Sequence, residues 1–150
     1  MLALPWRSPA SLSYSTGELI REALFAGDAW QAMDSLLGIS AQPSEIDAYW
    51  LSNLLDFLPI GTRDGFWSAY LHNGYEKNGI VARIIEATTD IDLEYLDCKV
   101  AARWALILLW FTAAADRRVK DHATRGVTAI FRAKCEIIAP SIARIQRFYN

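Results

Sequence analysis

The fold is decided by residues 116–127, DRRVKDHATRGV, which follow closely on the apolar run ALILLWF at residues 105–111. The apolar run has the character of a buried helix, and the later stretch places Val119 and Val127 on one helix face among small residues. Asp116 precedes this second helix, where its carboxylate can accept from the exposed N–H groups of the first turn. We therefore predict two antiparallel helices joined by a tight polar turn, which is the unit of an α-helical solenoid.

Helical spacing of apolar residues and helix-ending signals recur along the rest of the chain. A first helix is predicted after Ser15, and a second that ends at Leu37, before Gly38. Four further helices are predicted from Pro43 to Phe57, from Thr62 to Leu71, from Ile80 to Thr88 and from Glu94 to Ala114. The last two begin at Arg117 and near Lys134. No stretch alternates between apolar and polar residues, so we predict an all-α fold of stacked helical hairpins, a HEAT/armadillo-like α-solenoid segment. Residues 1–14 are expected to be an irregular lead-in, and residues 15–150 a helical-repeat domain.

Composition excludes several classes of protein. The chain has 150 residues, of which 53% are hydrophobic and 12% aromatic, so it can bury a core and is not expected to be disordered. The apolar run at residues 105–115 is about half the length of a membrane span, and residues 1–6 lack the pattern of a signal peptide. We expect a cytoplasmic protein that does not interact with membranes.

Charge is distributed unevenly along the chain. The net charge of −2 gives no general attraction to nucleic acid, but residues 1–115 carry a balance of −7 and residues 116–150 a balance of +5. Within the basic end, Arg118, Arg125 and Arg132 recur every seven residues and share a helix face. This face can bind phosphates, or it can pair with the acidic part of a neighbouring helical unit.

Two motifs together suggest a relationship to a known family. Residues 58–71, LPIGTRDGFWSAYL, contain an Arg-Asp-x-Phe-Trp-Ser element, and about forty residues later come LWF at 109–111 and RVKDHAT at 118–124. The second motif is similar to the second helix of a HEAT repeat. In this order the motifs resemble the C-terminal helical-repeat region of bacterial STAND-type NTPases of anti-phage defence, related to the AVAST systems. The resemblance covers roughly residues 45–147.

The chain departs from this family in several places. Lys120 stands where Arg is usual, His122 where a basic residue is usual, and Gly126 where Ala is usual. No GxxxxGK[ST] motif is present in the sequence, so the family's ATPase residues cannot be carried over.

The resemblance implies a non-enzymatic protein-recognition or scaffold module that contacts a phage protein or other domains of an NTPase. On exposure and shape, we expect the partner-binding surface to include Arg63, Trp67, Arg118 and Arg125. Two of these residues also have a structural interpretation: Arg63 can pair with a neighbouring repeat, and Trp67 can belong to the core.

No pattern in the sequence indicates catalytic, cofactor-binding or metal-binding residues. His72 and His122 are the only histidines, and only Glu76, four residues after His72, comes near the spacing of a metal site. The alternative function is a nucleic-acid-binding helical domain that uses the basic C-terminal face. A small helical enzyme is a third possibility, for which the sequence offers no constellation of reactive side chains.

Overall fold

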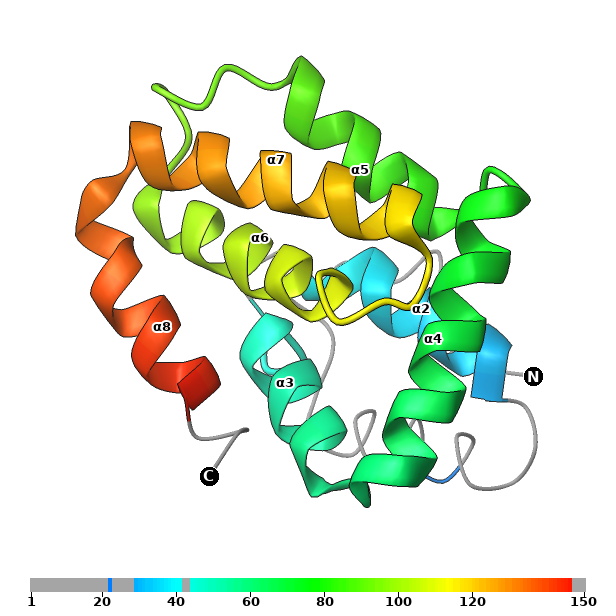
Figure 1. Ribbon diagram of the computed structural model, residues 1–150. Coiled ribbons are helices and arrows are strands. Elements are labelled where there is room, and N and C mark those ends of the chain that lie inside the picture. The colour runs from blue at the N-terminus through cyan, green and yellow to red at the C-terminus, as the bar shows by residue number, and fades with distance from the viewer. Residues whose placement is uncertain (1–21, 23–28, 42–43, 147–150) are drawn as a thin grey trace.

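The chain forms seven α-helices and no β-strand within the residues that the structure describes, which are 22, 29–41 and 44–146 of a computed structural model (Figure 1). The helices are α2 (Ala29–Ser40), α3 (Ala48–Phe57), α4 (Ile60–Glu76), α5 (Ile80–Asp90), α6 (Cys98–Phe111), α7 (Arg117–Ala133) and α8 (Ile138–Gln146), with a 3-10 helix η3 (Cys135–Ile137) before α8. The all-α prediction is confirmed. The lead-in at residues 1–14 and the helix expected after Ser15 lie outside the described residues.

Two aspartates determine where helices α3 and α6 begin. Asp47 accepts from the backbone N–H of Tyr49 at 2.9 Å, and Asp97 accepts from the backbone N–H of Lys99 at 2.9 Å. A side-chain oxygen that satisfies these free donors fixes the first turn of a helix. The predicted starts at Pro43 and Glu94 were therefore too early, and α6 is shorter than the predicted helix at residues 94–114.

Other predicted boundaries also need correction. Helix α2 continues through Gly38 to Ser40. Helix α4 begins at Ile60 after Pro59, so Thr62 lies inside the helix and does not cap it. The same helix continues past Leu71 to Glu76, and Asn78 then turns the chain with a positive φ of 51°. Gly38 therefore does not end the helix, although glycine often follows the last residue of one.

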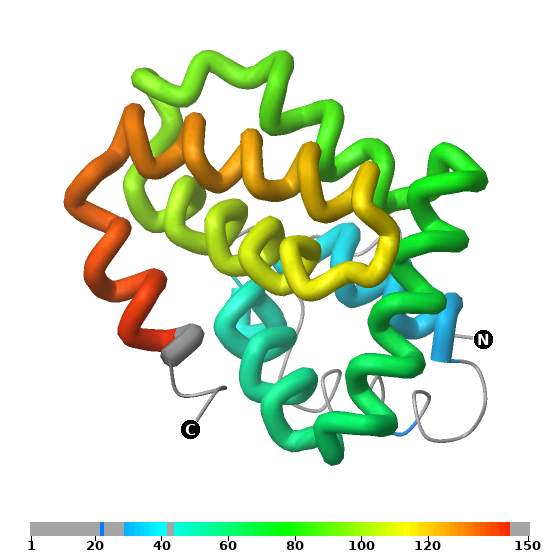
Figure 2. Tube along the Cα trace, viewed as in Figure 1, coloured from blue at the N-terminus to red at the C-terminus, as the bar shows by residue number. Residues whose placement is uncertain are grey.

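Helix α6 lies at the centre of the molecule (Figures 1 and 2). Helix α7 packs along one side of it and α3 along another, while α5 lies beside α7 and α4 crosses near the α6–α7 turn. Consecutive helices pair as α2 with α3, α4 with α5 and α6 with α7, as hairpins should. However, α3 also contacts α6, which joins the first pair to the third, whereas a simple solenoid has contacts only between neighbouring repeats. The HEAT-like stacking therefore stays a prediction.

No helix in the described part of the chain combines the length and the apolar character that a membrane span needs.

Aromatic side chains with satisfied polar groups connect four helices through the core. Trp67 of α4 packs against Phe111 of α6 with ring centroids 6.1 Å apart, and its indole N–H donates to the carbonyl of Trp110 at 2.9 Å. The indole of Trp110 donates in turn to Ser52 of α3 at 3.0 Å. Tyr70 donates to Asp34 of α2 at 2.6 Å. Buried polar groups with partners hold the packing in one arrangement without the cost of unsatisfied donors.

Small residues let α7 approach its neighbours closely. Ala123 is fully buried and Gly126 is buried. A Cβ atom built on Gly126 would lie 3.0 Å from both Leu108 of α6 and Thr88 of α5. Glycine weakens a helix by about 1 kcal/mol relative to alanine, but at position 126 it fits where three helices meet. Gly65 of α4 differs, because nothing lies within 4 Å of the position of its Cβ.

These two glycines provide a matched stability test. Gly65→Ala should raise the free energy of unfolding by about 0.5–1 kcal/mol, because alanine favours the helix and meets no neighbour. Gly126→Val should lower it by about 1–3 kcal/mol, because the larger side chain overpacks the contact with Leu108 and Thr88. Urea unfolding followed by tryptophan fluorescence measures both changes. A stabilising Gly126→Val would contradict the packing described here.

Candidate functional site

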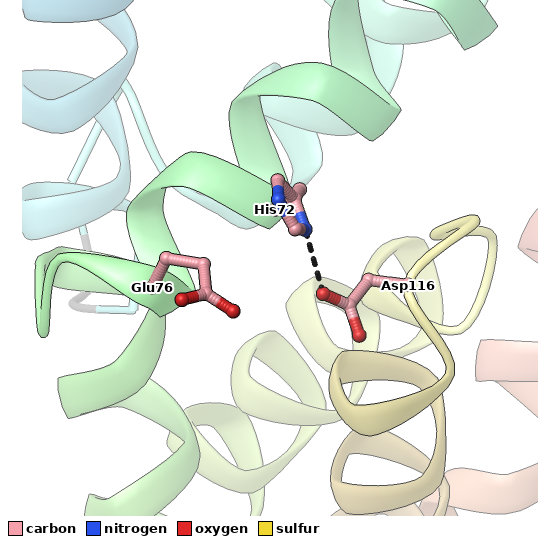
Figure 3. Close-up of side chains that lie close together, drawn as sticks. All are labelled: His72, Glu76 and Asp116. Carbon is pink, nitrogen blue, oxygen red and sulfur yellow. Dashed lines mark hydrogen bonds and ion pairs between the residues drawn. The ribbon is translucent and has the colours of Figure 1, made fainter.

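Three side chains whose nitrogen or oxygen atoms could ligate a metal ion converge where the end of α4 meets the start of α7 (Figure 3). His72 and Glu76 lie one turn apart on α4, and Asp116 is the residue before α7. The Nδ1 atom of His72 lies 2.7 Å from Oδ2 of Asp116, and one donor atom from each of the three residues lies within 4.8 Å of the others. This is the one such group of three or more His, Cys, Asp or Glu side chains found in the described residues.

The position of Asp116 follows from its role as the predicted cap of α7. Its Oδ1 atom accepts from the backbone N–H of Arg118 at 2.9 Å, as capping requires. The other oxygen, Oδ2, points toward His72 across the gap between the helices (Figure 3). The side chain of Asp116 is only 7% exposed, whereas that of His72 is 53% exposed. One carboxylate, largely covered by its neighbours, thus joins α7 to α4.

Arg118 supplies a positive charge to this cluster. Its guanidinium donates to both oxygens of Asp116, at 3.2 Å from Nε to Oδ1 and 2.8 Å from a terminal nitrogen to Oδ2, and it also pairs with Glu76. The same guanidinium lies over the ring of Tyr75, 5.4 Å from its centroid. A single cation therefore bridges two carboxylates, one on α4 and one at the start of α7, and balances one of their two negative charges.

The pKa values of the pair follow from these contacts. Hydrogen bonds from Arg118 lower the pKa of Asp116 well below its ordinary value, with a further contribution from His72, although burial of the carboxyl acts in the opposite direction. Hydrogen bonds to Asp116 and then to Glu76 raise the pKa of Arg118. Asp116 is accordingly ionised, and Arg118 charged, throughout the physiological pH range.

A cavity of about 320 Å³ adjoins the cluster between α4, α5 and α7. Its polar lining includes Glu76 and Arg118 from the cluster, together with Glu86 of α5 and His122 of α7. Nδ1 of His122 donates to the carbonyl of Arg118 at 2.7 Å, because a carbonyl oxygen can only accept. The cavity is open to a small polar group that approaches the cluster from this side.

The structure corrects one predicted partner-binding residue. Trp67 is only 2% exposed and belongs to the aromatic core, so it offers no surface to a partner. Its large apolar ring and its hydrogen bond to Trp110 explain why it lies inside. Arg63 is also mostly covered: its side chain is 11% exposed, packs 5.5 Å from the ring centroid of Trp110 and pairs with Asp64. Trp67 thus belongs to the core, and Arg63 pairs with a neighbouring side chain.

The three arginines spaced by seven residues differ in their surroundings. Arg118 is held by Asp116 and Glu76, whereas Arg125 and Arg132 are exposed and form no hydrogen bond or ion pair with the described residues. Of the predicted partner-binding residues, only Arg125 is exposed and has no hydrogen bond or ion pair with the described residues. Arg118 is half exposed, but its charge is already compensated.

Sequence reasoning missed the cluster because its members are far apart in the chain. The spacing of His72 and Glu76 was visible, but nothing in the sequence connected them to Asp116, which lies 44 residues after His72. A motif search that counts only nearby residues could not find the third member.

No family model, curated protein or solved structure matches this chain.

The pH dependence of stability tests the Asp116 contacts. Because folding lowers the pKa of this carboxyl, its ionised form stabilises the native state at neutral pH, and this contribution is lost as pH falls below the ordinary pKa of 3.8. Asp116→Asn keeps a capping oxygen but removes the charge. We expect the variant to be less stable by about 1–2 kcal/mol at pH 7, since the partners are half exposed.

This difference should shrink steadily as pH falls from 3.8 toward the lower native pKa. Urea unfolding of both proteins from neutral to acidic pH measures it. Asp121→Asn is the matched control, because Asp121 pairs only at the surface, with Arg117 at 3.4 Å. A wild-type advantage over Asp116→Asn that stays constant with pH would contradict an ionic origin.

Proposed function

We propose that this chain is a non-enzymatic helical module that recognises a protein partner or holds other domains in place. The motifs at residues 58–71 and 109–124 resemble the repeat arm of anti-phage STAND NTPases. In that context the arm is HEAT-like, acts in the cytoplasm, and binds a phage protein or other domains of the NTPase.

The observation that carries this proposal is the outer face of α7. This helix buries Val119, Ala123 and Ile130, and it presents a row of cations on the opposite side. The exposed cations of the helix outside the α4 cluster are Arg117, Lys120, Arg125 and Arg132. A helix of 17 residues with exposed cations on its outer face offers a surface for an acidic partner.

The charges of this face favour a protein over a nucleic acid. Arg117 already pairs with Asp121, and Arg118 with Asp116 and Glu76. The helix therefore keeps three cations without a carboxylate partner among the described residues: Arg125 and Arg132 on this face, and Lys120 on its flank. Three cations neutralise about three phosphates, which gives weak binding with a salt slope of about −3. An acidic protein surface needs only a few such contacts at the edge of an apolar interface.

The DNA that flanks the coding sequence tests the relationship to the NTPases. We expect it to encode a P-loop ATPase upstream, in the same frame or separated by one stop codon or frameshift. If it does, the ATPase region should be expressed separately and tested for co-purification with this chain. Arg125→Glu/Arg132→Glu should weaken that association, whereas Lys77→Glu/Arg83→Glu, on α4–α5, should leave it unchanged.

A gene that stands alone among unrelated neighbours would remove the relationship to the NTPases. If both double variants co-purified equally with the ATPase region, the α7 face would not be the binding surface.

The second candidate function is nucleic-acid binding, favoured by the shared helix face of Arg118, Arg125 and Arg132. Fluorescence anisotropy with a labelled DNA duplex at several salt concentrations distinguishes the two functions. We expect weak binding with a salt slope no steeper than about −3. A slope near −6, reduced in Arg125→Ala/Arg132→Ala but not in Lys77→Ala/Arg83→Ala, would favour nucleic acid. Arg118 is left intact because its substitution also breaks the contacts with α4.

A further inference from the structure

The donor atoms of His72, Glu76 and Asp116 have the chemistry of a metal site. They offer one imidazole nitrogen and two carboxylate oxygens, mutually within 4.8 Å. A mixed nitrogen and oxygen set of this kind suits zinc, which binds three protein ligands and a water with tetrahedral geometry in open sites. Magnesium and calcium prefer sites built from oxygen alone.

A cation already occupies this position. The guanidinium of Arg118 contacts Oδ2 of Asp116 at 2.8 Å and pairs with Glu76, so it bridges the two carboxylates that a metal would bridge. The guanidinium does not contact His72, whose Nδ1 atom lies 2.7 Å from Oδ2 of Asp116. A divalent ion can take a lone pair from each of the three side chains, whereas the guanidinium contacts the two carboxylates of the cluster and not His72.

We propose that His72, Glu76 and Asp116 bind one zinc ion in place of the Arg118 guanidinium. Zinc would take Oδ2 of Asp116, while Oδ1 continues to cap α7. His72 and Glu76 stand one turn apart on α4, so both can face one ion. The exposed sides of His72 and Glu76, 53% and 46% exposed, leave room for water in the fourth position.

The backbone supports all three ligand positions. Asp116 is fixed by its capping bond, and His72 and Glu76 are carried by a helix of 17 residues. Ligands on helices and caps lose little freedom when a metal binds, which favours affinity. Arg118 has a long side chain on the exposed start of α7 and can turn outward to solvent when zinc enters. The inference does not depend on the recognition function.

Isothermal titration calorimetry of the whole chain with zinc chloride tests this site. The titration uses Cys98→Ser/Cys135→Ser as background, since both cysteines are free and thiolates also bind zinc. We expect one zinc per chain, and no heat from magnesium chloride at the same concentration. His72→Ala and Glu76→Gln should each weaken binding by more than about tenfold, because even the loss of an outer-shell contact costs that much.

Arg118→Gln distinguishes a metal site from an ion-pair network. It removes the competing cation and keeps the ligands, so it should tighten zinc binding, in the direction opposite to the ligand variants. Glu86→Gln, in the adjoining cavity, is the control that should leave binding unchanged. Circular dichroism checks that each variant is folded.

Three outcomes overturn the proposal. They are no binding to the background chain at millimolar zinc, unchanged binding in His72→Ala, and weaker binding in Arg118→Gln.

Discussion

The burial of α6 is the constraint on which the rest of the structure depends. Seven of its 14 residues are buried, among them Leu106, Ile107, Leu108 and Phe111. Burial of each such side chain contributes about 1.5–3 kcal/mol, far more than the ion pairs at the surface, which contribute about 0–1 kcal/mol. A helix that is apolar nearly all round needs cover on every side. Helices α3, α7 and α8 supply contacts around it.

This central helix determines where the polar features lie. The chain leaves α6 at the turn near Asp116, so the first residue that can cap α7 stands at the edge of the core and beside the end of α4. Helix α7 then lays its small and apolar residues against α6 and α5. Its charged residues are left on the outside, where Arg125 and Arg132 point into solvent. The charged cluster and the basic face thus both result from the way α7 packs against α6 and α5.

The sequence predicted those features that depend on neighbouring residues. The α6–α7 hairpin, the cap at Asp116 and the close packing at Ala123 and Gly126 all follow from local periodicity and residue size. Helix starts at α3 and α6 were misplaced because the caps at Asp47 and Asp97 compete with other polar residues nearby, and only geometry decides between them.

Long-range features could not be predicted in the same way. The burial of Trp67 depends on Trp110 and Phe111, more than forty residues away. The meeting of His72 with Asp116 depends on how α4 crosses the α6–α7 turn. An arginine's charge was visible in the sequence, but whether that charge is free, as at Arg125, or compensated, as at Arg118, depends on such crossings.

The energetics of the cluster make exchange of its cation physically reasonable. Arg118 is half exposed, so its ion pairs contribute no more to stability than the loss expected for Asp116→Asn, which a metal ion that contacts the same carboxylates can offset. Asp116 is different, because its capping bond and its burial are part of the α7 start whichever cation it faces. A carboxylate fixed by its capping bond and paired with an exposed counter-ion is an arrangement in which the proposed zinc binding need not disturb the fold. The core around α6 holds the helices in place, and the junction of α4 and α7 lies at their surface, where the proposed exchange of Arg118 for zinc would leave that core unchanged.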